Sequence, residues 1–471
     1  MAHGVMGPRK TVDETLATTE EEGFRLKKEL GALDVTVLGI GVMIGAGIFI
    51  LTGQAAADEA GPAVTLSFIL AAIVCALAAL CYAELASMVP AAGSAYTFTY
   101  ATLGELIAFT IGWDLVLEFT VGASAVAVGW SAYLNATLDQ LFGYTLPAAI
   151  SSPPSKEGGV VNLPAMVIII ALGFLLYRGI RITAKANIGF VIVTIIVLLV
   201  VIGVGATEVN TGNWTPYFPF GFGGVIGGAA LVFFAFIGFD IVATAAEETR
   251  NPQRDMPIGI VASLVITTFL YVAVAAVVTG MILYERLGSA APVADAFDTL
   301  DKPWVASFVY IGALVALTNT VLILMLGQTR VAFAMARDRL LTPRLAATHP
   351  RFGTPSRLTM IFTLFIAVIA GFTSIDTLAE LVNIGTLFAF VLVAIGVLLL
   401  RRSDPDRRRP FRVPGVPVIP VLSVAGSLVL MATLDGSTWI RFVVWMALGL
   451  VVYFAYARRN SAITESRDRA G

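Results

Sequence analysis

Charge, cysteine and histidine are all scarce in this sequence, and each shortage excludes a class of protein. Only 13% of the 471 residues are charged and 58% are hydrophobic, whereas soluble domains average about 25% charged and about 45–50% apolar residues. This composition excludes a water-soluble enzyme and a disordered chain. Cys75 and Cys81 share one apolar run, and the only histidines, His3 and His349, lie in polar segments. We therefore expect no disulfide framework, no zinc or haem site and no cofactor.

Apolar runs long enough to cross a lipid bilayer recur along nearly the whole chain. A bilayer core of about 30 Å needs about 20 helical residues. On that basis the sequence predicts twelve spans, at roughly 34–54, 63–88, 103–134, 162–178, 187–206, 223–246, 258–283, 304–334, 358–373, 377–400, 417–434 and 439–457. The first 33 residues are polar, so we expect no cleavable signal peptide. We predict an all-α polytopic membrane protein with twelve transmembrane helices.

The basic residues predict how these spans are oriented, because Lys and Arg concentrate in cytoplasmic loops. With the N-terminus inside, 26 of the 30 basic residues face the cytoplasm, and the exceptions are Lys156, Arg286, Lys302 and Arg441. This bias predicts a multi-pass protein of the plasma membrane with both termini cytoplasmic. The net charge of −2 gives no indication of a nucleic-acid partner.

Two spans contain glycine at mid-span. The first includes Gly45-Ala-Gly47, and the sixth includes Phe233-Phe-Ala-Phe-Ile-Gly-Phe-Asp240. Each glycine costs a helix up to about 1 kcal/mol relative to alanine, and unwound backbone at membrane depth must be buried in protein or line a cavity. Breaks in spans one and six predict two five-helix repeats of inverted topology.

The predicted organisation follows from these breaks and from the charged segments. It comprises a cytoplasmic tail (1–33), a first five-helix repeat (34–206), a second inverted repeat (207–400), a basic cytoplasmic loop (401–416), helices 11 and 12 (417–457) and a cytoplasmic C-terminal tail (458–471).

Broken helices offer backbone groups to a ligand. The N-terminus of a half-helix presents unpaired amides and a partial positive charge, which suit a carboxylate, and its C-terminus presents carbonyls, which suit an ammonium group. A site offering both binds an amino acid zwitterion without a charged side chain.

Several further motifs occur in order along the chain. They are Tyr82-Ala-Glu-Leu-Ala86, Gly93-Ser-Ala-Tyr96, Gly112-Trp-Asp-Leu-Val-Leu-Glu118, Glu247-Glu-Thr-Arg-Asn-Pro-Gln-Arg254, Gly327-Gln-Thr-Arg330 and Arg409-Pro-Phe-Arg-Val-Pro-Gly415. With the two breaks, they make nearly the whole chain resemble the amino acid–polyamine–organocation superfamily, and within it the bacterial cationic amino acid transporter branch. The resemblance implies a leucine-transporter-type fold, alternating access and an L-amino acid substrate.

The same resemblance implies roles for individual residues. The backbone amides of four residues of span one would bind the substrate carboxylate: Ile44, Ala46, Gly47 and Ile48. Three carbonyls of span six would accept from its amino group: Phe234, Ala235 and Ile237. Phe236 and Phe239 are candidates for an aromatic lid, with ordinary core packing as the alternative.

Among the side chains, Glu118 gives the most specific functional prediction. An acid near the middle of a span costs roughly 2.5–3.5 kcal/mol on insertion scales and is normally functional. The resemblance places Glu118 near the substrate, for proton handling or recognition of a cationic side chain, and the alternative is a structural hydrogen bond to a neighbouring helix. Asp114 shares its helix face.

The other acids near the spans have different expected roles. Asp240 either fixes the unwound segment or contacts substrate, and Glu84, Glu247 and Glu248 are expected to pair with cytoplasmic arginines in gates or loops.

One departure from the family concerns the coupling ion. The resemblance implies a lysine in span five of proton-coupled relatives, at a position that falls on or beside Thr194, and no lysine lies inside any predicted span of this chain. Coupling through Glu118, uncoupled exchange, and a sodium ion held by Thr194, Thr318 and Thr320 remain open. For these threonines, hydrogen bonding to their own helix is the alternative.

The predicted function is that of a secondary transporter of L-amino acids, with cationic ones among the candidates, driven by proton symport or by exchange. A permease for polyamines or other organic amines is the alternative in the same class. A channel or a membrane-embedded enzyme is the alternative in another class, but the spans show no ring of like residues and no catalytic cluster. The expected partners are the amino acid, lipid and a proton or sodium ion, and the sequence does not indicate whether a small single-span subunit binds.

Overall fold

The structure is a computed structural model, and it describes residues 3–4, 7–19, 28–154, 158–289, 291–350 and 352–462. Parts of both expected tails lie outside these residues, namely 1–2, 5–6 and 20–27 of the N-terminal tail and 463–471 of the C-terminal tail. Within the described residues the strands are limited to one antiparallel pair, β1 (His3–Gly4) and β2 (Gly7–Pro8). Helices make up most of the remainder, so the prediction of an all-α protein is confirmed.

The helices follow one another in chain order from α1 to α19. The first half of the chain contains α1 (Val12–Thr19), α2 (Ala32–Met43), α3 (Thr52–Ala55), α4 (Val64–Met88), α5 (Ala95–Thr102), α6 (Glu105–Phe142), α7 (Ala148–Ser151), α8 (Leu163–Tyr177), α9 (Ile180–Gly205) and α10 (Gly221–Val232). The second half contains α11 (Phe239–Thr244), α12 (Pro252–Met281), α13 (Pro292–Thr299), α14 (Pro303–Arg337), α15 (Ser356–Phe372), α16 (Ile375–Ser403), α17 (Val418–Ala432), α18 (Gly436–Val452) and α19 (Arg458–Asn460).

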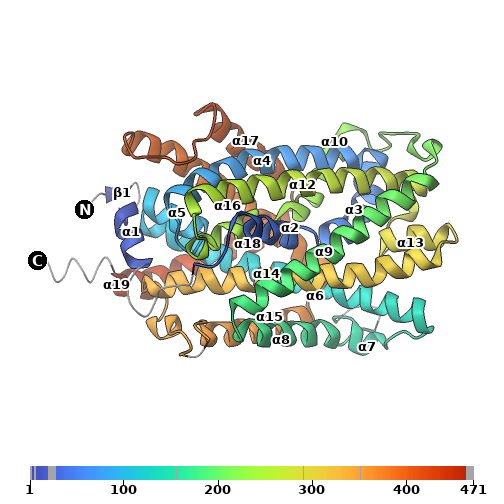
Figure 1. The fold of residues 1–471 in the computed structure, drawn as a ribbon, viewed down its shortest axis with the longest axis horizontal. Coiled ribbons are helices and arrows are strands. Elements are labelled where there is room, and N and C mark those ends of the chain that lie inside the picture. The colour runs from blue at the N-terminus through green and yellow to red at the C-terminus, as the bar shows by residue number, and fades with distance from the viewer. Residues whose placement is uncertain are drawn as a thin grey trace, which may run out of the picture.

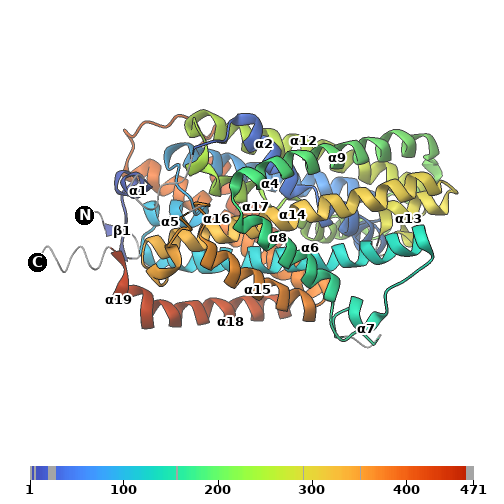
Figure 2. The ribbon, with the colours of Figure 1, turned by 60° about the horizontal axis from the view of Figure 1, so that its bottom comes forward.

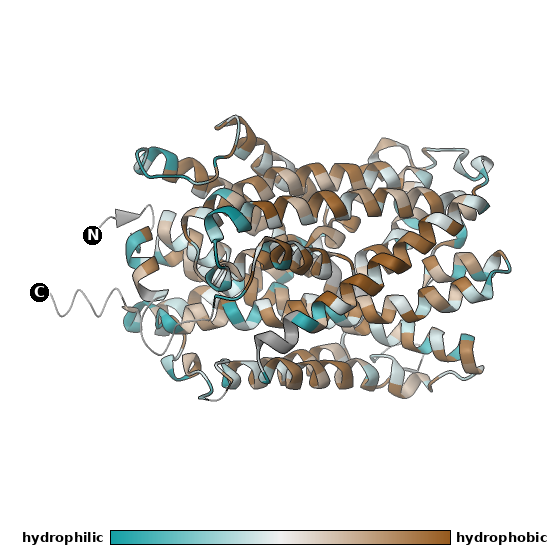
Figure 3. Ribbon diagram, in the orientation of Figure 1, coloured by the Kyte–Doolittle hydropathy of each residue, from teal (hydrophilic) through white to brown (hydrophobic). Residues whose placement is uncertain are grey.

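Eight helical stretches of the described chain are long and apolar enough to cross a membrane, and four shorter apolar helices accompany them. The four shorter helices are α2, α8, α15 and α17. Most residues along the helices are hydrophobic, and the hydrophilic residues are concentrated toward the ends of the bundle (Figure 3). Large apolar side chains on outer helices face outward, for example Val167 of α8 at 63% exposure and Phe269 of α12 at 72%. Such surfaces suit a lipid environment, and the protein is a multi-pass membrane protein as predicted.

The long helices run side by side along the longest axis of the molecule (Figure 1). Helix α6 packs against α14 and α16, and α4 packs against α12. Helix α2 lies among α9, α12 and α14, in the interior. Helices α1 and α19 lie at the same end of the bundle in both views (Figures 1 and 2).

Small residues allow α2 to approach α12 closely. A Cβ on Gly39 would overlap the side chain of Ser263, and a Cβ on Gly259 would overlap that of Val35. Close backbone approach through small residues is how transmembrane helices commonly pack, because lipid tails provide no hydrophobic drive between helices. The packing brings the broken region that follows α2 into the centre of the protein.

Candidate functional site

The first helix break lies in the middle of the bundle, directly after α2. Helix α2 ends at Met43, and Ile44 leaves helical geometry with φ −77° and ψ 90°. A π-helical turn, η1 (Gly47–Leu51), then continues without interruption through α3 and η2 (Ala56–Ala60). Because the first amides of a helical stretch have no intrahelical acceptor, those near Gly47 are directed toward the break. The amide of Ile44, in contrast, donates to the carbonyl of Ile40 at 3.0 Å in this conformation.

The second break separates α10 from α11. A 3-10 turn, η6 (Phe233–Phe236), ends at the extended residue Ile237. Gly238 has φ 137°, and a Cβ at this position would overlap the side chain of Val42, so glycine is required here for two reasons. Oδ1 of Asp240 accepts a hydrogen bond from the amide of Gly238 at 3.0 Å. Asp240 therefore holds the unwound segment in place.

The two breaks touch each other. A Cβ on Gly47 would overlap the backbone of Ala235. The hydroxyl of Tyr271, on α12, lies 2.5 Å from the carbonyl oxygen of Met43 and 2.9 Å from that of Ala235. One side chain thus contacts the ends of both broken helices.

Two of the carbonyls expected to receive an ammonium group already accept one hydrogen bond each. The carbonyl of Ala235 accepts from Tyr271, and that of Phe234 accepts from the amide of Ile237 at 3.3 Å. A carbonyl oxygen has two lone pairs, so each keeps capacity for a second donor.

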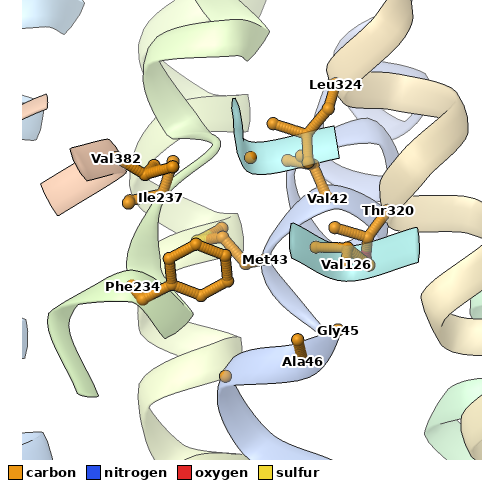
Figure 4. A pocket seen from close by; sticks show the side chains of 12 residues that line it. Val42, Met43, Gly45, Ala46, Val126, Phe234, Ile237, Thr320, Leu324 and Val382 are labelled. Carbon is orange, nitrogen blue, oxygen red and sulfur yellow. The ribbon is translucent and has the colours of Figure 1, made fainter. Parts of the chain in front are cut away.

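A small cavity lies between the breaks (Figure 4). Its lining residues come from α2 and the first break, α6, the second break, α14 and α16: Val42, Met43, Gly45, Ala46, Gly47, Gly122, Val126, Phe234, Ile237, Thr320, Leu324 and Val382. Thr320 is the one polar side chain in this set, and none is ionisable.

Four of the predicted substrate-binding residues line the cavity and five do not. The four are Ala46, Gly47, Phe234 and Ile237, and the five are Ile44, Ile48, Ala235, Phe236 and Glu118. The candidates for an aromatic lid pack elsewhere. Phe236 contacts Tyr271 with ring centroids 5.2 Å apart, and Phe239 contacts Phe390 at 5.0 Å. Both rings are fully buried, so Phe234 is the aromatic ring at the cavity.

Glu118 lies one helical turn from the cavity residue Gly122 on α6, and it is buried. Its Oε1 accepts a hydrogen bond from the hydroxyl of Thr386 on α16 at 2.5 Å. Among the described residues, Oε2 of Glu118 and both carboxyl oxygens of Asp114 have no hydrogen-bond partner. Burying a carboxyl oxygen without a hydrogen-bond partner is costly.

The structure does not bring the three threonines of the sodium hypothesis together through their hydroxyls. The hydroxyl of Thr194 donates to the carbonyl of Phe190 at 2.9 Å, and that of Thr318 donates to Leu314 at 2.7 Å. Both bonds are to the residue's own helix, as the alternative interpretation expected. The hydroxyl of Thr320 also lies 3.2 Å from the carbonyl oxygen of Ala316 on its own helix, and in addition 3.4 Å and 3.3 Å from those of Gly41 and Ile44.

Two asparagines outside the predicted site residues, Asn187 and Asn319, lie near Thr320. Nδ2 of Asn319 donates to Oδ1 of Asn187 at 2.8 Å and to the carbonyl of Gly41 at 3.2 Å. Both side chains are buried, and amides within apolar spans were the signal that could have revealed them. They connect α9 and α14 to α2 beside the first break. Within the described residues, no group of His, Cys, Asp and Glu could hold a metal ion.

The acids near the span ends form the expected ion pairs with arginine. Glu84 pairs with Arg401 at 2.6 Å, Glu247 pairs with Arg337 at 3.2 Å, and Glu248 pairs with Arg330 at 2.5 Å. Burial raises the pKa of Glu248, and the neighbouring Arg330 partly opposes that rise.

Comparison with known proteins identifies the family. The model of the amino acid permease family matches residues 30–456. The chain is 48% identical to the branched-chain amino acid permease of Bacillus subtilis, over 97% of this chain and 98% of that protein. It is 46% identical to the methylthioribose transporter of the same organism, over 97% of this chain and 99% of that protein. It is 39% identical to the vacuolar cationic amino acid transporter 4 of Arabidopsis thaliana, over 84% of this chain and 67% of that protein. The chain therefore belongs to the amino acid permease family and is an amino acid transporter rather than an enzyme.

Proposed function

We propose that this protein is a secondary transporter that moves neutral L-amino acids across the plasma membrane by alternating access. In this proposal the eight long stretches and four shorter helices form twelve transmembrane helices. Residues 34–206 and 207–400 form two inverted five-helix repeats of the leucine-transporter type, and helices 11 and 12 follow. The location of α1 and α19 at one end of the bundle, together with the basic bias of the loops, supports two cytoplasmic termini.

The observation that carries the proposal is the meeting of two helix breaks at one cavity. The amides near Ala46 and Gly47 would bind the carboxylate of the substrate, because they begin a helical stretch and carry its partial positive charge. The carbonyls of Phe234, Ala235 and Ile237 would accept from the ammonium group. Ile44 and Ile48 would contribute after a rearrangement, since neither lines the cavity in this conformation.

The lining favours a neutral, apolar substrate side chain over a cationic one. No acid is among the residues that line the cavity. Glu118 lies one turn before Gly122 on α6 and accepts a hydrogen bond from the hydroxyl of Thr386. A buried cationic side chain without a counter-charge would be strongly disfavoured. The lack of an acid in the cavity lining also argues against a polyamine substrate. The high identity to a branched-chain amino acid permease agrees with this choice.

Proton coupling through Glu118 is the favoured driving mechanism. Glu118 is a buried acid one turn from the cavity with an unpaired oxygen, and Asp114 on the same helix face has two. A proton taken from the outer side would neutralise Glu118 while the cavity is occupied. Asp240, which holds Gly238, and Phe239, which packs on Phe390, would then move with α11 during gating. Sodium coupling has weaker support, because Thr194 and Thr318 bond to their own helices.

The test is uptake by the purified protein in proteoliposomes. Radiolabelled L-leucine should accumulate under an inward proton gradient, and an inward sodium gradient alone should not support accumulation. Unlabelled leucine, isoleucine and valine should compete, whereas arginine and spermidine should not. Methylthioribose belongs in the panel because a relative at 46% identity carries that name. Competition by methylthioribose with none by any amino acid would overturn the proposal.

A further inference from the structure

Gly122 is the cavity residue whose identity the packing of the protein does not explain. It lies within α6, and its backbone is not among those with positive φ. A Cβ at this position would meet Cδ2 and Cδ1 of Leu324 at 3.4 and 3.6 Å and Cγ2 of Val382 at 3.8 Å, which are ordinary van der Waals distances. Neither the backbone conformation nor a close contact requires glycine here.

The other two glycines of the cavity differ from Gly122. A Cβ on Gly45 would overlap the hydroxyl of Thr320, and one on Gly47 would overlap the backbone of Ala235. Those glycines are explained by the close packing of the breaks. Glycine is also among the poorest helix formers, so Gly122 lowers the stability of α6 relative to alanine. A functional benefit of the missing side chain would offset that cost.

The side chain that Gly122 lacks would point into the cavity wall formed by α6, α14 and α16. Val126 follows Gly122 by one turn on the same face of α6, and Leu324 and Val382 complete this part of the lining. In the view of Figure 4, Leu324 and Val382 lie away from Gly45 and Ala46. If the first break holds the substrate carboxylate, the substrate side chain extends toward this apolar wall.

We propose that Gly122 sets the size of the amino acid side chain that the cavity accepts, because the space that a Cβ at this position would fill borders Leu324 and Val382, where the outermost carbons of leucine, isoleucine or valine would lie. The inference rests on the proposed function, because it assumes that an amino acid occupies the cavity. It goes further by assigning size selection to one position on α6. A methyl group at 122 would occupy the space of the outermost substrate carbons and leave the zwitterion contacts unchanged.

The experiment measures KM for L-leucine and L-alanine in proteoliposomes containing wild type, Gly122→Ala or Gly203→Ala. Gly203 lies on α9 with no atom within 4 Å of a Cβ, so its substitution adds the same methyl group away from the cavity. One methylene in an apolar pocket changes discrimination by about 10–200-fold. For Gly122→Ala we expect the KM of leucine relative to that of alanine to rise by about tenfold or more, and for Gly203→Ala no change in that ratio.

A second variant tests the same wall from the opposite direction. Val382→Ala removes volume, so phenylalanine and methionine should compete with leucine more strongly than in wild type. Equal loss of leucine and alanine uptake in folded Gly122→Ala would overturn the inference and assign Gly122 to helix packing or movement. An unchanged leucine-to-alanine ratio would overturn it as well. Failure of the proposed function is seen separately, as absence of any amino acid uptake by wild type.

Discussion

The hydroxyl of Tyr271 lies 2.5 Å from the carbonyl oxygen of Met43, the last residue of α2. The same hydroxyl lies 2.9 Å from the carbonyl oxygen of Ala235 in the second break. A tyrosine hydroxyl has one proton to donate, so the two carbonyls share it. Tyr271 is fully buried and packs against Phe68 and Phe236. A side chain on an unbroken helix therefore sets the distance between the two broken ones.

Tyr271→Phe should weaken substrate binding while leaving the ring packing intact. The lost hydrogen bond has a net value of about 1 kcal/mol, and we expect KM for leucine to rise roughly fivefold through misplacement of the breaks. The measurement is leucine counterflow in proteoliposomes. Tyr456→Phe, which removes a hydroxyl at the end of the bundle near Thr342, is the control and should leave KM unchanged. An unaltered KM in Tyr271→Phe would show that the breaks keep their spacing without this hydroxyl.

Gly47→Leu should abolish uptake. Any Cβ at this position overlaps the backbone of Ala235, which cannot move aside as a flexible side chain would. The two breaks would be forced apart, and the amides and carbonyls would no longer face one ligand. Gly203→Leu, on the open face of α9, is the matched control and should transport normally. Normal leucine binding by Gly47→Leu in a scintillation proximity assay would rule out a zwitterion site at the breaks.

Glu118→Gln should keep the exchange of leucine across the membrane but lose its accumulation driven by a proton gradient. Glutamine keeps an oxygen that accepts from Thr386 but carries no ionisable proton. Leucine counterflow should therefore persist, while accumulation under a proton gradient should fall to the level seen without a gradient. Thr386→Val, which removes the hydrogen bond and keeps the carboxyl, should still accumulate leucine. Full gradient-driven uptake by Glu118→Gln would exclude this acid as the proton carrier.

Glu84→Gln should destabilise the protein far more than loss of an exposed acid. Glu84 is 1% exposed and pairs with Arg401, and it also accepts from the amide of Val413 at 2.7 Å. Removing one partner of a buried pair costs about 3–5 kcal/mol when the other charge stays buried, and the side chain of Arg409, 3.5 Å from Glu84, is only 3% exposed. Asp13, paired with Arg407 but 83% exposed, is the comparison, and Asp13→Asn should cost about 0–1 kcal/mol. Thermal unfolding in detergent measures both, and equal shifts in the midpoint would contradict the buried pairing.

Only part of the cavity is predictable from the sequence. The mid-span glycines of spans one and six indicated the breaks, because they lie where unwinding exposes backbone groups at membrane depth, and such groups must be buried in protein or line a cavity. The apolar wall was not predictable. Val126, Leu324 and Val382 resemble dozens of other apolar residues, and only the packing of α6, α14 and α16 brings them to the cavity. The choice between an aromatic lid and core packing for Phe236 and Phe239 depended on the same packing, and both rings lie in the core.

The sequence by itself determined the class of protein, the number of apolar runs, the family and the location of both helix breaks. Those properties depend on composition, run length and local backbone preference, which act within a few residues of each other. Only the tertiary structure decided that Tyr271 bridges the breaks, that Asn187 and Asn319 meet beside Thr320, and that Gly122 borders the cavity. Each of these depends on how helices distant in the sequence pack against one another, and periodicity along one helix does not specify that packing.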